Sequence, residues 1–123
     1  MYKENIILGI VDWIEANLSS DNSLAIDVIS ERSGYSKWHL QRMFKSVTGY
    51  QIAKYIRYRR LSCAALELCS TDAAIIHISQ KYSFDSQQSF TRIFKKRYKR
   101  PPGDYRKNNV FDESFIFPKW DKK

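Results

Sequence analysis

An internal repeat is the feature that most constrains this chain of 123 residues. Before a turn near residue 35, similar residues recur 49 positions later along the chain: Ile26, Ile29, Ser30 and Tyr35 are matched by Ile75, Ile78, Ser79 and Phe84. Beyond it the offset is 50, with Ser36, Leu40, Arg42, Phe44, Lys45 and Tyr55 matched by Ser86, Phe90, Arg92, Phe94, Lys95 and Tyr105. A turn tolerates a one-residue insertion that a packed helix would not. The repeat predicts two copies of one unit, which is too few for a solenoid.

The placement of helix breakers indicates what each unit is made of. All three prolines fall after residue 100, and only four glycines are present, so most of the chain can be helical. We therefore predict an all-α fold of about seven helices. The expected helices cover residues 3–18, 24–33, 37–47, 51–69, 73–82, 87–99 and a short segment near 104–106.

Polar residues before the expected helices predict their caps. Ser23 and Ser36 are expected to cap the second and third helices, Asp85 or Ser86 the sixth, and the Ser70-Thr71-Asp72 run the fifth. Each copy is then a helix-turn-helix unit. The predicted organisation is an N-terminal subdomain at 1–50, a linker helix at 51–69, a C-terminal subdomain at 70–107 and an aromatic tail at 108–123.

The charge of the chain is concentrated in its middle. The formal net charge is +8; residues 1–33 carry −4, residues 34–107 carry +12 and residues 108–123 are neutral. A basic segment favours nucleic acid, but anionic lipid attracts it as well. No signal peptide or membrane span is expected, because Asp12 and Glu15 interrupt the only apolar N-terminal run. Cys63 and Cys69 are expected to be reduced core thiols of a cytoplasmic protein.

A helical wheel separates two faces on the second helix of each unit. Leu40, Met43, Phe44 and Val47 lie opposite Trp38, Gln41, Arg42 and Lys45, and Phe90, Ile93 and Phe94 lie opposite Gln88, Thr91, Arg92 and Lys95. Arginine, glutamine and threonine match base edges in a DNA major groove. Because the same polar residue types recur on both units, these faces are more consistent with recognition of DNA than with a face that is only solvated. Trp38 supports this reading if it is exposed, the alternative being that it packs on a neighbouring helix.

Little in the sequence points to catalysis. His39 and His77 form no zinc-ligand spacing with the two cysteines, and no glycine-rich phosphate loop or nucleophile–base set occurs. We expect no enzyme activity, no metal and no cofactor. Basic side chains on the linker helix and after the second unit suit phosphate contacts instead, although adjacent Arg59 and Arg60 cannot both face one groove.

Two segments carry a resemblance to a known family. Residues 34–45 with Thr48-Gly49 and Tyr55-Ile56-Arg57, and residues 84–96 with Pro102 and Tyr105-Arg106, closely resemble the AraC/XylS family of transcription regulators. The residues of both segments are most similar to those of the stand-alone MarA, SoxS, Rob and RamA subgroup. The resemblance covers roughly residues 5–107.

The resemblance implies a monomer whose two recognition helices enter successive major grooves of double-stranded promoter DNA. It also implies an activator that recruits RNA polymerase to stress, efflux and antibiotic-resistance genes in the bacterial cytoplasm, with no membrane partner and no small-molecule effector. Major grooves recur every ~34 Å, and a 19-residue linker helix is ~28 Å long. The expected base contacts are Trp38, Gln41, Arg42, Gln87, Gln88, Thr91 and Arg92. The expected phosphate contacts are Ser36, Lys37, His39, Lys45, Lys54, Arg57, Ser86, Lys95, Lys96 and Arg106.

The chain departs from the family pattern at two positions. Ser83 stands where the family usually has glycine before the second turn, so a left-handed backbone there would cost ~1–2 kcal/mol. Ile52 stands where many members have proline.

Two alternatives stay open on the sequence. The basic segment alone would also serve a nonspecific architectural DNA-binding protein or a membrane-surface protein, and the sign of regulation, activation or repression, is not encoded. The neutral tail is aromatic, so Phe111, Phe115 and Phe117 are expected to pack back on the helical body, on the side of the acidic first helix. Its alternative is a docking segment for a partner such as polymerase.

Overall fold

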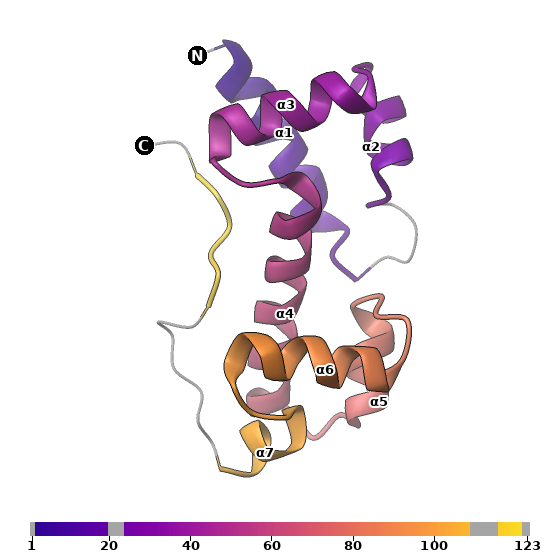
Figure 1. The fold of residues 1–123 in the computed structure, drawn as a ribbon, viewed down its shortest axis with the longest axis vertical. Coiled ribbons are helices and arrows are strands. Elements are labelled where there is room, and N and C mark those ends of the chain that lie inside the picture. Colours follow the sequence, from indigo (N-terminus) through magenta and orange to yellow (C-terminus); the bar gives the residue numbers. More distant parts are fainter. Residues whose placement is uncertain (1, 20–23, 109–115, 122–123) are drawn as a thin grey trace. The chain divides into compact units, whose positions relative to one another are not determined.

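The computed structural model describes residues 2–19, 24–108 and 116–121 (Figure 1). Within those ranges every regular element is an α-helix, which confirms the predicted all-α fold. The helices are α1 (Tyr2–Ala16), α2 (Ile26–Ser33), α3 (Lys37–Thr48), α4 (Ile52–Ser70), α5 (Ile75–Lys81), α6 (Gln87–Tyr98) and α7 (Pro102–Lys107).

The chain divides into two compact units. Unit 1 comprises residues 1–59 and 118–123, and unit 2 comprises residues 60–117. The division falls inside α4, so the helix expected to be a separate linker supplies packing residues to both units. Its buried side chains include Ile52, Tyr55 and Ile56 in unit 1 and Leu61, Ala64, Ala65 and Leu68 in unit 2.

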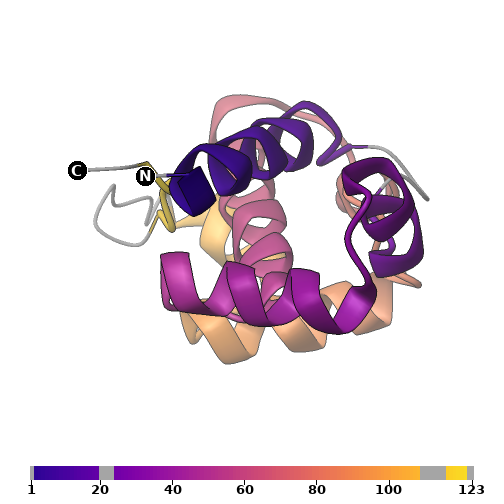
Figure 2. The same ribbon diagram turned by 90° about the horizontal axis from the view of Figure 1, so that it is seen from above.

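Unit 1 is built on the helix-turn-helix pair α2 and α3, with α1 packed against α3 (Figure 2). The apolar stripe of α1 is buried, with Ile7, Val11 and Ile14 fully inaccessible. Arg59 and Glu15 join α4 to α1 within this core through a two-pronged ion pair, in which Arg59 Nε donates to Glu15 Oε2 over 3.1 Å. Arg59 is thus a structural residue of unit 1.

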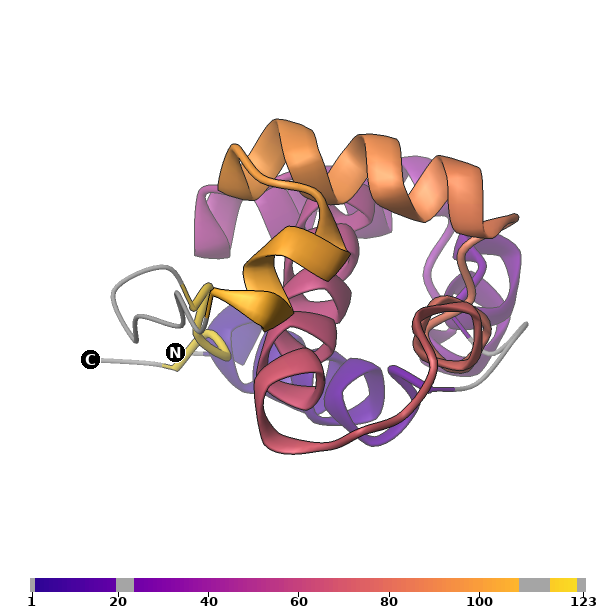
Figure 3. The same cartoon turned by 90° about the horizontal axis from the view of Figure 1, so that it is seen from below.

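Unit 2 repeats the pair as α5 and α6 and adds α7 (Figure 3). Its core is aromatic: Phe90 and Phe94 are fully buried, and the Phe94 and Tyr105 rings meet edge to face with centroids 5.2 Å apart. Edge-to-face pairs stabilise by ~0.5–1.5 kcal/mol beyond the area they bury. The contact between Phe94 of α6 and Tyr105 of α7 therefore holds α7 against α6.

Serine caps confirm the predicted starts of α3 and α6. Ser36 Oγ accepts a hydrogen bond from the His39 amide at 3.2 Å, and Ser86 Oγ accepts one from the Ser89 amide at 3.0 Å. Ser86, and not Asp85, is therefore the cap of α6. These caps fix where each exposed face begins.

The first helix of each unit begins differently from the prediction. The N-cap of α2 is Ala25 and that of α5 is Ala74, and neither is capped by a side chain. Capping of α5 by the Ser70-Thr71-Asp72 run is wrong, because Thr71 Oγ accepts from the Ala73 amide and so closes a turn before the helix. Ser23 lies outside the described residues.

Among the residues that the structure describes, four turn residues have a left-handed backbone, and the repeat relates them in pairs. Gly34 (φ 80°) corresponds to Ser83 (φ 63°), and Gly49 (φ 86°) corresponds to Lys99 (φ 67°). Unit 1 uses glycine at both places, whereas unit 2 uses residues with a side chain. Ser83 therefore has the left-handed backbone on which its predicted strain depends.

The described part of the tail, residues 116–121, lies against the body. The Phe117 amide donates to Ser62 Oγ at 2.7 Å, and the Trp120 amide donates to the Tyr55 hydroxyl at 2.9 Å. Lys119 pairs with Asp12 of α1 at 2.7 Å, which agrees with the side expected. Packing is confirmed for Phe117, which is half-buried, while Phe111 and Phe115 lie outside the described residues.

The two cysteines lie on α4 and form no disulfide with each other. Both are half-buried, so they are not the core thiols that the sequence predicted.

Candidate DNA interface

The α3 helix presents a polar face whose residues share exposure and lie opposite the core. Leu40, Met43 and Phe44 are buried on one side, as the wheel predicted. The other side carries the exposed side chains of Trp38, Gln41, Arg42 and Lys45. The prediction of one buried and one exposed face is confirmed for unit 1.

Trp38 is 65% exposed, so the alternative that it packs on a neighbouring helix is wrong. It contacts Arg42, whose Cζ atom lies 4.5 Å from the centroid of the Trp38 ring. Stacking on the ring occupies a flat face of the guanidinium and leaves its N–H groups at the edge available. The pair therefore presents a preoriented bidentate donor beside a large apolar surface.

A hollow of about 410 Å³ lies beside this face and includes a residue that sequence reasoning missed. Its lining joins Gln41, Arg42 and Lys45 of α3 to Gln51, Ile52 and Ala53 at the start of α4. Gln51 is an exposed amide of the kind that hydrogen-bonds bases or phosphates. No sequence signal marked it, because its place beside α3 depends on the left-handed turn at Gly49.

The α6 helix repeats the arrangement in unit 2. Phe90 and Phe94 are fully buried, while the exposed side chains are Gln87, Gln88, Arg92, Lys95 and Lys96. Thr91, also expected on this face, is half-buried. Gln88 stands where unit 1 has Trp38, so the two faces share their arginine and lysine positions but differ in the aromatic one.

Most of the expected phosphate-binding residues are exposed, and several are held in place by neighbours. Lys37 forms an ion pair with Asp27, and the His39 ring meets the Tyr35 ring edge to face at 5.1 Å. On α4, Lys54 Nζ lies 5.7 Å from the Tyr58 ring centroid. The exposed members of the set are Ser36, Lys37, His39, Lys45, Lys54, Arg57, Ser86, Lys95 and Lys96.

Arg106 differs from the rest of that set. It is half-buried, and its guanidinium donates to two backbone carbonyls, from Nε to Leu68 at 2.8 Å and from Nη2 to Ala73 at 2.7 Å. These bonds satisfy carbonyls near and beyond the last turn of α4, where helical acceptors lack partners. These contacts give Arg106 a structural role in unit 2, unlike the exposed members of the set.

Neither a metal centre nor a membrane helix is found in the described part of the chain. No group of three or more His, Cys, Asp or Glu side chains gathers there as metal ligands would. None of the described helices combines the length and apolarity needed to cross a bilayer.

The repeated fold and its paired basic faces are those of a helix-turn-helix protein. The helix-turn-helix domain family matches residues 29–108. The chain is 47% identical over 113 residues to the multiple antibiotic resistance protein MarA of Escherichia coli (strain K12), covering 91% of this chain and 87% of MarA. It is 42% identical over 114 residues to the probable transcription factor PqrA of Proteus vulgaris, covering 93% of each.

A solved structure agrees with these sequence matches. The C-terminal domain of AraT, a response regulator from Geobacillus stearothermophilus, superposes with a TM-score of 0.79 at 27% identity, covering 88% of each chain. The class is thus a DNA-binding transcription regulator and not an enzyme. More particularly, the chain belongs to the AraC/XylS family, in the subgroup similar to MarA and Rob.

Proposed function

We propose that this chain acts as a monomeric activator that reads two successive major grooves of promoter DNA and recruits RNA polymerase. The observation that carries the proposal is the recurrence of one exposed arginine- and lysine-bearing face on α3 and α6, each opposite a buried core. A solvated surface has no reason to repeat its chemistry at matching positions. The similarity to MarA, a multiple antibiotic resistance protein, supports antibiotic-resistance promoters as targets. Stress and efflux promoters, and action in the cytoplasm, are proposed from the family resemblance.

The base-reading groups are proposed to be those at the centre of each face. In unit 1 these are Trp38, Gln41 and Arg42, with the Trp38 ring suited to a thymine methyl and Arg42 to the guanine O6 and N7 atoms. In unit 2 they are Gln87, Gln88, Thr91 and Arg92. Half-buried Thr91 would reach the DNA only through its outward-facing atoms.

The phosphate-binding groups are proposed to flank those centres. Lys45, Lys54 and Arg57 would hold the backbone near unit 1, and Lys95 and Lys96 near unit 2. The two capping serines are at the helix starts, where backbone amides add to the attraction for phosphate. Such contacts set the register of the protein and add affinity that falls as salt rises.

Selection of bound sequences from random DNA tests the base assignments. Arg42→Ala and Arg92→Ala should each weaken specific binding by ~1–3 kcal/mol and relax preference at one base position. Lys81→Ala is the matched control, because Lys81 is an exposed cation paired with Glu67 and outside both faces. An unchanged base preference in either arginine variant would contradict the assignment.

A gel-shift titration in rising salt separates this proposal from its rival, a nonspecific architectural or membrane-surface protein. A sequence reader keeps a difference of ~4–10 kcal/mol between matched and scrambled duplexes, whereas a nonspecific binder loses both together. Transcription from a template carrying the selected site then distinguishes activation from repression.

A further inference from the structure

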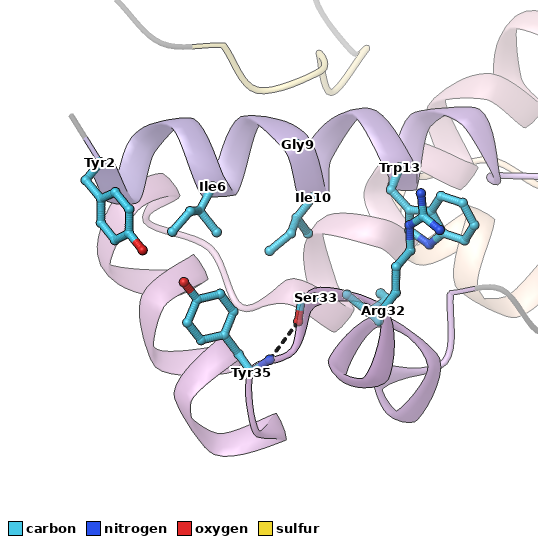
Figure 4. Close-up of a pocket in the computed structure, with 9 residues that line it drawn as sticks. Tyr2, Ile6, Gly9, Ile10, Trp13, Arg32, Ser33 and Tyr35 are labelled. Carbon is cyan, nitrogen blue, oxygen red and sulfur yellow. Dashed lines mark hydrogen bonds between the residues drawn. The ribbon is translucent and has the colours of Figure 1, made fainter.

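A cavity of about 310 Å³ lies in unit 1, on the side of α1 that faces α2 and the helix-turn-helix turn (Figure 4). This volume is at the lower end of the range of small-molecule sites in proteins. Apolar side chains of Ile6, Ile10 and Ile29 line its middle. The remaining lining residues are Tyr2, Gly9, Trp13, Arg32, Ser33 and Tyr35.

The two ends of the cavity differ chemically. At one end the hydroxyls of Tyr2 and Tyr35 point toward each other (Figure 4), and the neighbouring Tyr2 side chain raises the pKa of Tyr35. At the other end the Arg32 guanidinium lies over the Trp13 ring, with Cζ 3.8 Å from its centroid. The cavity thus has neutral hydroxyls at one end, apolar side chains in its middle and the Arg32 guanidinium at the other end.

Arg32 is available for an anion. Within the described part of the chain no carboxylate pairs with it, and its contact is with the face of Trp13. A guanidinium stacked in this way keeps its edge donors free in the fork that matches a carboxylate. Its position at the rim of an apolar hollow favours an anion that carries an apolar body.

Gly9 is one of the residues that line this cavity. It lies inside α1, where glycine destabilises a helix relative to alanine. Its backbone is not among the left-handed glycines, and a Cβ atom built on it would meet nothing within 4 Å. Neither backbone conformation nor close packing requires this glycine, whereas its place in the cavity lining explains the missing side chain.

We propose that this cavity binds a small amphipathic monoanion, a carboxylate with a flat apolar body. The carboxylate would pair with Arg32, and the body would lie on the isoleucine floor between the Trp13 and Tyr35 rings. The cation selects the charge of the ligand, and the cavity volume limits it to about the size of a fused two-ring compound. This ligand goes beyond the proposed DNA-binding function and stands against the expectation that no small molecule binds.

Calorimetric titration of the full chain with 2-naphthoate tests the proposal, with 2-naphthamide as the neutral isostere. Naphthoate should bind with a dissociation constant of ~10 μM to 1 mM, and the amide ~10-fold more weakly or worse. Methyl NMR shifts should concentrate at Ile6, Ile10 and Ile29. No binding to the wild-type chain, or equal binding of acid and amide, would overturn the proposal.

Two variants place the ligand. Arg32→Gln should weaken naphthoate binding ~10-fold, while Arg100→Gln, the same charge change in unit 2, should leave it unchanged. Gly9→Leu should abolish binding by filling the hollow, whereas Ala16→Leu on the same helix should not. Unaltered affinity in Gly9→Leu would refute the site; should that variant fail to fold by circular dichroism, Arg32→Gln and the amide decide. No DNA is present, so the test stands or falls independently of the proposed function.

Discussion

Replacing Lys99 by glycine should stabilise unit 2. Lys99 ends α6 with φ at 67°, where an L-residue is strained by ~1–2 kcal/mol. Glycine removes that strain but gives the unfolded chain more freedom, which offsets ~0.4–1 kcal/mol. The hydrogen bond from the exposed Lys99 ammonium to the Lys96 carbonyl contributes little. A net gain of ~0.5–1 kcal/mol is therefore expected, or ~2–5 °C in melting temperature.

The measurement is thermal unfolding followed by calorimetry, with amide hydrogen exchange in α6 to assign the change to unit 2. Lys99→Ala is the matched control, since it loses the same charge but keeps the Cβ atom, and its melting temperature should stay near that of the wild type. Gly49→Ala is the mirror experiment. A Cβ there would meet nothing within 4 Å, so backbone strain alone should destabilise unit 1. A melting temperature of Lys99→Gly at or below that of Lys99→Ala would refute the reasoning.

Three further predictions follow from contacts in the two units. Arg106→Ala should lower the free energy of unfolding by ~2–3 kcal/mol, because two carbonyls lose their donors, and a urea titration measures it. For Glu67, burial raises the pKa, but bonds from Lys81 and a neighbouring tyrosine outweigh it, so the folded pKa lies below its ordinary value of 4.5. Its contribution to stability is thus complete above that pH and is lost as pH falls through the folded pKa; Glu67→Gln should flatten this acid limb in a pH series of melts. Lys54→Ala or Arg57→Ala should weaken matched and scrambled DNA alike and reduce the salt slope by ~1, and a change of base preference would show that the residue reads bases.

The helices and the two exposed faces were predictable because they depend on local rules. Apolar spacing of 3.6 residues places Leu40 and Phe44 inside, and a serine at the first position of a helix is a local signal. Because the sequence contains the unit twice, the same pattern could be found independently in each copy. Where α2 and α5 begin was less predictable, because their caps are alanines and tertiary packing sets the boundary.

Contacts between distant residues were beyond sequence reasoning. The basic residues that follow the second unit in the sequence, Arg106 among them, were predicted to contact phosphate. The Arg106 guanidinium instead donates to backbone carbonyls 33 and 38 residues away. Gln51 was missed for the same reason, since a turn brings it beside α3. Neither the spacing nor the type of these residues carries information about such partners.

Two of the attachments of the tail are made by its main chain, and this determines which experiments can detect them. Both hydrogen bonds run from backbone amides, of Phe117 and Trp120, to hydroxyls on α4. An alanine scan across 116–121 keeps every amide and would leave both bonds intact, whereas proline at either position would delete one. Each of the two hydroxyls therefore requires only an N–H at the matching position, whatever the side chain there, whereas the Lys119–Asp12 ion pair is an attachment that an alanine scan would remove.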